Sequence, residues 1–162
     1  MKTGITALVL PAEWGLEKTL ETIRGDGYET LELALRDSGY CALGASDSQL
    51  RSIREEANRA KVELVGLCPA FRGRPRDLMT ADREARNAGI ETFEECIRMA
   101  TVLDVDTILV VLGSLTPDLY YDVAYRNALE SMRTLAPVAE KAGVRLAIEY
   151  VWNKFLLSPL EF

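Results

Sequence analysis

The chain has 162 residues, of which 48% are apolar and 27% are charged, and its formal net charge is −6. These proportions are typical of a single globular domain with a buried core, and they exclude a disordered or fibrous protein. The acidic balance argues against nucleic acid as the main partner, because binding a polyanion requires a basic surface. Three widely spaced cysteines, Cys41, Cys68 and Cys96, indicate a reduced, cytoplasmic protein rather than a disulfide framework.

Two absences narrow the possible functions further. No apolar stretch approaches the roughly 20 residues of a membrane-spanning helix, so we expect no membrane partner. The chain contains no histidine, which excludes a Ser-His-Asp or Cys-His site and an imidazole base. Catalysis by these residues must therefore use carboxylates, lysine, tyrosine or cysteine.

Apolar periodicity predicts strands and helices in strict alternation. Glycines follow the first and fourth predicted helices, as is common where a helix ends. The predicted strands cover residues 5–10, 28–34, 62–67, 107–112 and 144–150, and three of the predicted helices cover residues 16–24, 49–60 and 121–141. A long helix begins near Thr80, its expected cap, and Gly89 is a position that can divide it.

Three local patterns add detail. In the second strand, Leu31 and Leu33 face one way while Glu32 faces the other. The fourth strand is almost uninterruptedly apolar, which is typical of a parallel strand covered on both faces. Residues 46–48 can cap the second helix, and Ser158 followed by Pro159 is typical of the first turn of another helix.

Strict alternation of strands and helices implies an α/β fold with a parallel sheet. Two architectures fit: a doubly wound open sheet, and part of a (β/α)8 TIM barrel. The turn after the first strand, residues 11–15, is not the glycine-rich phosphate loop of the first architecture.

A single carboxylate follows the fifth strand directly. The apolar run 144–148 ends at Glu149, and Trp152, Asn153 and Lys154 come soon after it. In a barrel of alternating strands and helices, the C-terminal ends of the strands carry the chemistry. Glu149 is therefore a candidate metal ligand, general base or both, with an ion-paired strand-end carboxylate as the alternative.

Other candidates follow the neighbouring strands. Glu32 closes the second strand and is either a pocket residue or a solvated carboxylate. Cys68 follows the third strand, where a small buried side chain is favoured over a pocket role. Asn153 and Lys154 are placed to contact substrate hydroxyls or a phosphate; the equal alternative is a loop that orients Glu149 through a hydrogen bond.

For the aromatic and basic residues near the same strand ends, the sequence leaves two roles open. Trp152, like Trp14, can form the floor of a sugar pocket or serve in packing. Arg72, Arg74 and Arg76 lie on the loop after the third strand, where they can hold a phosphate or remain solvated.

Four segments together resemble a known family. Residues 27–33 resemble the second-strand motif of xylose-isomerase-like sugar phosphate isomerases and epimerases, and residues 78–86 are similar to that family's entry into its third helix. Residues 144–149 resemble its fifth-strand motif. Residues 151–161 are similar to the branch of keto-sugar-phosphate 3-epimerases and hexulose-phosphate isomerases.

The resemblance implies the first five parallel strands and four helices of a TIM barrel, as one incomplete domain over residues 1–162. We expect the strand order 1-2-3-4-5, a curved sheet, and all helices on the convex side. It also implies one divalent cation (Mn²⁺, Mg²⁺, Co²⁺ or Zn²⁺) held by four side chains, of which the fifth-strand glutamate matches Glu149. The family's other ligands, an Asp, a His and a second Glu, belong to strands six to eight, which this sequence does not contain.

The implied reaction is proton transfer on a keto sugar or sugar phosphate through a cis-enediolate, with the two glutamates as bases. Only one of them is present, so we expect this chain not to complete the reaction. The alternative is a non-catalytic remnant that acts in binding or assembly. An endonuclease branch shares the barrel but needs a histidine-rich multi-metal site and a basic groove, and both are missing. Unpaired edge strands also predict possible self-association.

Overall fold

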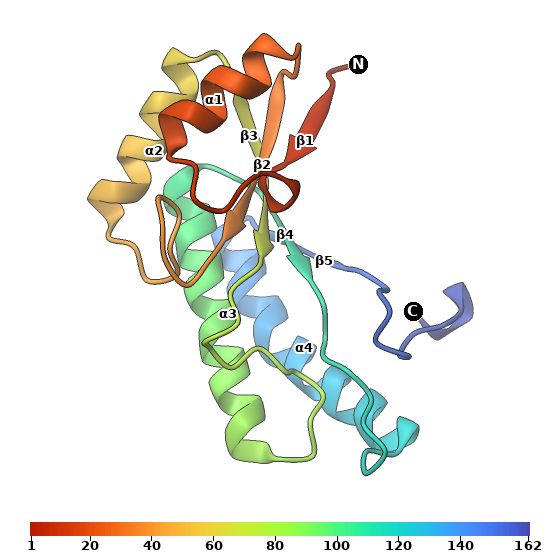
Figure 1. Ribbon diagram of the computed structural model, residues 1–162. Coiled ribbons are helices and arrows are strands. Elements are labelled where there is room, and N and C mark those ends of the chain that lie inside the picture. The colour runs from red at the N-terminus through yellow and green to blue at the C-terminus, as the bar shows by residue number, and fades with distance from the viewer.

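The computed structural model describes all 162 residues and contains one sheet of five parallel strands in the order β1-β2-β3-β4-β5 (Figure 1). The strands are β1 (Gly4–Thr6), β2 (Thr30–Leu35), β3 (Glu63–Pro69), β4 (Thr107–Val110) and β5 (Arg145–Ile148). The helices are α1 (Leu16–Gly25), α2 (Asp47–Arg59), α3 (Arg83–Leu103) and α4 (Tyr121–Ala142), with 3-10 turns η1 (Ala7–Val9) and η2 (Pro159–Glu161). The expected strand order is confirmed.

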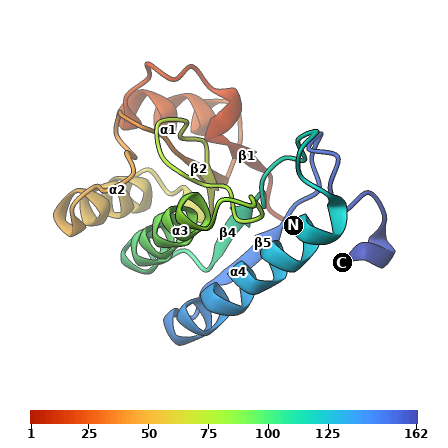
Figure 2. The ribbon, with the colours of Figure 1, turned by 90° about the horizontal axis from the view of Figure 1, so that it is seen from below.

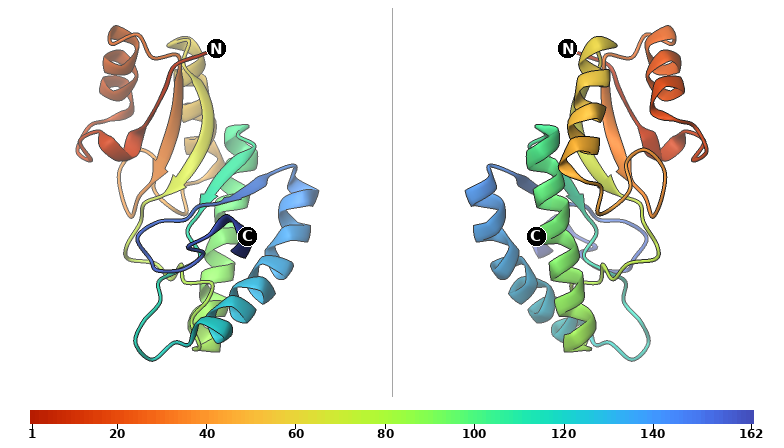
Figure 3. Two further views of the ribbon diagram at one scale, coloured as in Figure 1. Left: turned by 90° about the vertical axis from the view of Figure 1, so that its right-hand side faces the viewer. Right: turned by 90° about the vertical axis from the view of Figure 1, so that its left-hand side faces the viewer.

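The four helices cover one face of a curved sheet. Seen from below, they follow one another in chain order around the outside of the strands (Figure 2). Figure 3 shows the molecule from two opposite sides. In its left view the strands lie in front of α3, and in its right view α2 and α3 lie in front of the strands. A doubly wound sheet carries helices on both faces, so the arrangement agrees with the expected partial barrel. No helix combines the length and the apolar character that a membrane crossing requires.

The core lies between the convex face of the sheet and the helices. Leu31 and Leu33 of β2 and Leu67 of β3 are completely buried there, as is Ile108 of β4. The helices contribute the predicted apolar stripes, which in α1 are Leu16, Leu20 and Ile23 and in α2 are Leu50, Ile53 and Ala57.

A bulge in β3 decides which side chains reach the concave face. Leu31 pairs with Leu64, but Glu32 pairs with Gly66, so Val65 is an extra residue without a partner in β2. In-register neighbours share a face, and a one-residue slip reverses every side chain that follows. The bulge therefore places Cys68 on the same face as Glu32.

The first predicted strand is wrong in its second half. β1 ends at Thr6, whose hydroxyl accepts a hydrogen bond from the backbone N–H of Leu8 at 3.2 Å and so caps the turn η1. Apolar character alone suggested a strand through residue 10. Leu8 and Val9 are nevertheless exposed, because no neighbouring strand or helix covers them.

The start of α3 also differs from the prediction. Its cap is Asp82 rather than Thr80, since the Asp82 carboxylate accepts hydrogen bonds from the backbone N–H groups of Glu84 and Ala85. Gly89 does not divide the helix, which runs unbroken for 21 residues. This glycine instead lies against the backbone of Asp77.

Other boundaries shift by a few residues. The fourth and fifth strands end earlier than predicted, at Val110 and Ile148. Leu109 of β4 is only half-buried, so the expected cover on both faces is absent within these residues. Two predicted caps are confirmed: Ser46 forms a capping box with Gln49, and the Ser158 hydroxyl accepts a hydrogen bond from Leu160 at the start of η2.

Candidate functional site

The C-terminal ends of the parallel strands meet at one rim of the sheet, and the loops that follow them surround it. Glu32 lies inside β2, three residues before its end, so the expectation that it closes the strand is wrong. Its half-buried side chain passes over Gly66, where an added Cβ would lie 3.6 Å from the Glu32 Oε1 atom. The Glu32 carboxylate therefore lies beside β3 on the concave face.

Cys68 is buried near two carboxylates, Glu32 and Glu149. It exposes 6% of its surface, and burial raises the pKa of its thiol to about 11. The negative charges of Glu32 and Glu149 raise this pKa further, while Arg36 and Arg76 oppose the rise. Both carboxylates thus act on one thiol. The raised pKa keeps that thiol protonated near neutral pH, which is the state of an inert buried cysteine rather than of a nucleophile.

Glu149 follows β5 at the rim. Its backbone N–H donates to the carbonyl of Val110 at 3.0 Å, which continues the ladder between β4 and β5 by one residue. Its side chain is exposed and makes no hydrogen bond or ion pair within the chain. The ion-paired alternative is therefore not observed, and the carboxylate is accessible from solvent.

Asn153 joins the loop after β5 to the loop after β4. Its buried amide donates from Nδ2 to the carbonyl of Gly113 at 2.8 Å, and its Oδ1 accepts from the Phe155 N–H at 3.3 Å. The Asn153 carbonyl accepts from the Leu115 N–H at 3.1 Å. These bonds favour the alternative in which Asn153 shapes the loop around Glu149 over direct contact with a substrate.

The aromatic residues of this segment divide into buried and exposed ones. Phe155 is buried, and its ring centroid lies 5.2 Å from that of Tyr121 on α4. Trp152 is 99% exposed, so the packing alternative is not observed for it. Lys154 is exposed as well. Trp14 is half-buried, and the Lys18 ammonium lies 5.7 Å from its ring centroid.

Three loops at the rim line one open depression of about 550 Å³. The loop after β3 contributes the three arginines Arg72, Arg74 and Arg76, and the loop after β5 contributes Trp152 and Asn153. The loop after β4 adds two residues that the sequence did not single out, Gly113 and Ser114. Their only sequence signal is that they come directly after a buried strand.

A larger cavity, of about 830 Å³, lies at the opposite end of the strands. Its lining carries charges of both signs, and two pairs of them meet there: Lys2 with Glu63, and Arg54 with Asp104. In barrels of this kind the N-terminal end of the strands serves stability rather than chemistry. We therefore assign the candidate site to the C-terminal rim.

The rim residues do not form a complete metal site by themselves. The chain contains no group of three or more His, Cys, Asp or Glu side chains that could hold a metal ion. Protein-bound zinc takes three or four protein ligands, and calcium takes six to eight oxygens. Glu32 and Glu149 offer two carboxylates, which is too few.

Comparison with known proteins identifies the fold. Residues 20–161 match the family profile described as the xylose isomerase-like TIM barrel. No curated protein sequence matches the chain significantly.

Solved structures are similar at low identity. D-psicose 3-epimerase from Clostridium cellulolyticum H10, with D-tagatose, has a TM-score of 0.82 and 22% identity, over 99% of this chain and 57% of that one. A D-psicose 3-epimerase in the presence of D-fructose has a TM-score of 0.75 and 24% identity, over 93% and 53%. The IOLI protein with a zinc atom has a TM-score of 0.72 and 18% identity, over 93% and 52%. The chain thus spans about half the length of these structures, and the likeness shows the shared fold.

Proposed function

The chain belongs to the xylose isomerase-like TIM barrel family, and on that premise we propose that residues 1–162 form the N-terminal part of a sugar or sugar phosphate isomerase or 3-epimerase. The observation that carries the proposal is the exposed, unpaired carboxylate of Glu149 directly after β5. Cys68 lies close enough to Glu149 for the charge of that carboxylate to raise the pKa of the Cys68 thiol. Similar structures that are named as epimerases of keto sugars support a small sugar as the substrate.

Glu149 is the proposed base. In this role its carboxylate removes the proton from the carbon next to the substrate carbonyl, which leaves a cis-enediolate. The proton returns to the neighbouring carbon in an isomerisation, whereas in an epimerisation a proton returns to the opposite face of the same carbon. Epimerisation therefore needs a second acid on that face, which Glu149 cannot supply. A positioned acid or base of this kind contributes about 10²–10⁴-fold to the rate.

We further propose that Glu149 supplies one carboxylate to a divalent cation. Such a cation, when bound, acts as a Lewis acid on a carbonyl oxygen. Since these residues do not assemble a full ligand set, the remaining ligands would have to come from outside residues 1–162. The zinc atom in the IOLI structure supports a metal in this fold.

The remaining rim residues have supporting roles in this proposal. The exposed indole of Trp152 is suited to stack on the apolar face of a sugar ring. Lys154 offers an ammonium donor two residues further along the same loop. Asn153 acts on the substrate through the loop shape, because both polar ends of its side chain are already hydrogen-bonded.

The test is a chimera in which residues 1–162 replace the corresponding half of D-psicose 3-epimerase. Solvent deuterium entering the ketose at the carbon next to the carbonyl is followed by NMR. We expect the chimera to exchange this hydrogen and Glu149→Gln to slow the exchange by at least about 100-fold. Glu140→Gln, which removes an exposed carboxylate on α4, is the matched control and should exchange normally. A folded chimera without exchange, or a Glu149→Gln variant as fast as the control, would refute the proposal.

A second candidate function is binding or assembly without catalysis. It is favoured by the edge strands β1 and β5, each of which pairs on one side only. Unpaired strand edges are templates for association with another chain. In this case the purified chain would self-associate in sedimentation experiments, and the folded chimera would show no exchange.

A further inference from the structure

The loop between β3 and α3 carries three arginines in five residues, at positions 72, 74 and 76. All three are exposed, and none forms an ion pair within 4.0 Å. Arg76 donates one long hydrogen bond, from Nη1 to the carbonyl of Pro69 at 3.4 Å. By contrast, Arg86, Arg98 and Arg145 all pair with acidic side chains. The guanidinium groups of the loop therefore keep most of their donors free.

Hydrogen bonds hold this loop at both ends. Near its start, the Asp37 carboxylate accepts from the backbone N–H groups of Arg72 and Gly73 at 2.8 and 3.0 Å. At its end, Asp77 Oδ1 accepts from the N–H groups of Met79 and Thr80, both at 2.9 Å. The arginines thus project from a backbone that is already ordered, which lowers the entropic cost of binding a ligand.

The acidic residues near the loop are already engaged. Asp77 is the only acidic residue that lines the depression, and its Oδ1 atom is occupied by the two backbone donors described above. Both oxygens of Asp37 face the loop backbone rather than the depression's interior. Because its lining contains three arginines and one aspartate, the depression carries a positive balance of charge, although the chain as a whole is acidic.

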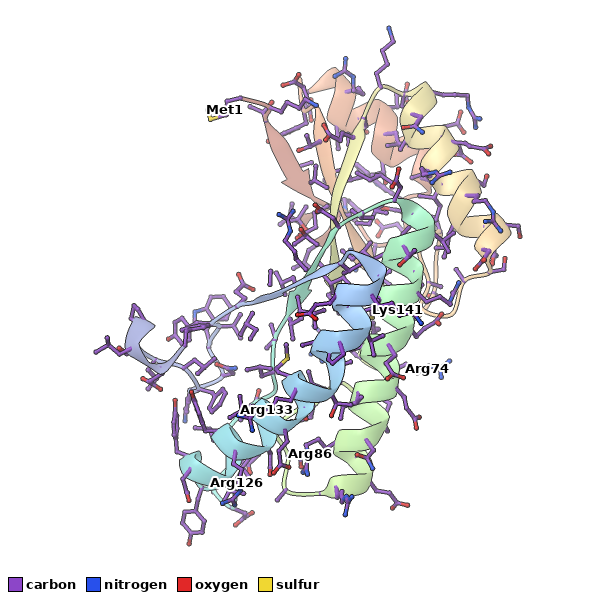
Figure 4. All side chains as sticks on the ribbon, turned by 180° about the vertical axis from the view of Figure 1, so that it is seen from behind. Met1, Arg74, Arg86, Arg126, Arg133 and Lys141 are labelled. Atoms are coloured by element: carbon purple, nitrogen blue, oxygen red, sulfur yellow. The ribbon has the colours of Figure 1, made fainter.

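Arg76 connects the depression to the carboxylate site. It lies close enough to Cys68 for its charge to act on the thiol, as the charges of Glu32 and Glu149 do. Arg74 is turned partly away, because it also borders a second hollow along α3 with Glu91 and Glu95, and it is seen beside that helix (Figure 4). Arg76 is thus the arginine best placed to face a ligand that also reaches Glu149, and Arg72, which lines the depression but not the second hollow, is the next candidate.

From this arrangement, and resting on the function proposed above, we propose that the depression is a phosphate subsite. Arg72 and Arg76 would bind the phosphate monoester of a phosphorylated keto sugar while the carbonyl end of the sugar lies at Glu149. Arginine guanidinium groups suit phosphate because they offer parallel donors and a full charge. Trp152, which also lines the depression, would cover the sugar between the two ends. The substrate would then be a sugar phosphate rather than a free sugar.

The test measures ligand binding to the full 162-residue chain by titration calorimetry and by NMR. Inorganic phosphate, D-fructose 6-phosphate, D-fructose and gluconate are titrated at low, constant ionic strength. We expect phosphate and the sugar phosphate to bind and D-fructose to bind at least about tenfold more weakly, since one charge-assisted hydrogen bond contributes about that factor. Arg76→Gln and Arg72→Gln should each weaken phosphate binding by about tenfold or more.

The matched control is Arg133→Gln, which removes an exposed arginine on α4 (Figure 4) that does not line the depression. It should bind phosphate as the unmodified chain does. Equal loss in Arg133→Gln and Arg76→Gln would show only a general charge effect and would overturn the subsite, as would equal binding of phosphate and D-fructose. Tighter binding of gluconate than of phosphate would overturn the choice of phosphate in favour of a carboxylate.

The readout separates the two proposals. Phosphate binding that depends on Arg72 and Arg76 supports the subsite even if the chimera fails to exchange hydrogen, in which case only the proposed reaction fails. A chimera that processes D-fructose without any preference for the phosphate ester overturns the subsite and leaves the proposed reaction standing.

Discussion

Gly89 is an interior residue of α3. Replacing it with alanine has two opposing effects on stability. In a helix interior, alanine is more favourable than glycine by about 1 kcal/mol. The tertiary structure opposes this gain, because an added Cβ would lie 2.7 Å from the carbonyl oxygen of Asp77 and 3.3 Å from its carbonyl carbon. These are backbone atoms, so relief requires α3 and the loop to separate.

The magnitude follows from these two terms. Forcing an extra methyl group into a packed contact costs about 1–3 kcal/mol, and the helix-propensity gain offsets about 1 kcal/mol of it. We therefore expect Gly89→Ala to lower the free energy of unfolding by about 1 kcal/mol. For a chain of this length, that corresponds to a fall in Tm of about 2–4 °C.

The assay is urea or thermal unfolding followed by circular dichroism, with Gly25→Ala as the control. Gly25 is the last residue of α1, and an added Cβ there would meet no atom within 4 Å. Gly25→Ala should leave the stability unchanged or raise it slightly. A Gly89→Ala protein more stable than the unmodified chain would refute the reasoning, since it would mean that the helix and the Asp77 backbone separate at no cost.

Two further predictions concern the rim. Asn153→Ala removes the hydrogen bonds to Gly113 and Phe155. Because each bond contributes about 1 kcal/mol, the free energy of unfolding should fall by about 2 kcal/mol. Urea unfolding measures this change, and an unchanged midpoint would contradict the prediction. The pKa of Cys68 is raised from 9.0 to about 11, so the unfolded chain releases its proton first as the pH rises. Stability should therefore fall between pH 9 and pH 11, and Cys68→Ala should reduce that fall in melts recorded across the pH range; an identical pH profile in the variant would argue against it.

Much of the fold is encoded in local patterns. The spacing of Leu16, Leu20 and Ile23 predicted the buried stripe of α1, and Ser46 predicted the capped start of α2. The sequence pattern also predicted that Glu149 directly follows the fifth strand. Such features depend on residues within a few positions of one another, because helix and strand periodicities and helix caps are short-range properties.

Other features required the packed structure. The bulge at Val65, which brings Cys68 onto the face of Glu32, depends on the pairing of β3 with β2 and has no signal of its own in the sequence. The half-exposed face of β4 at Leu109 also depends on the packed structure, because the apolar run of this strand predicted cover on both faces.

The amino-acid sequence by itself determined the order of strands and helices, the family resemblance and the candidate carboxylate. Only the tertiary structure decided that Asn153 braces its loop, that Gly89 is needed for a close approach to Asp77, and that the arginine loop and Trp152 line one depression. The physical reason is distance along the chain. Arg76 and Trp152 are far apart in sequence, and they become neighbours because parallel strands deliver all their following loops to the same rim.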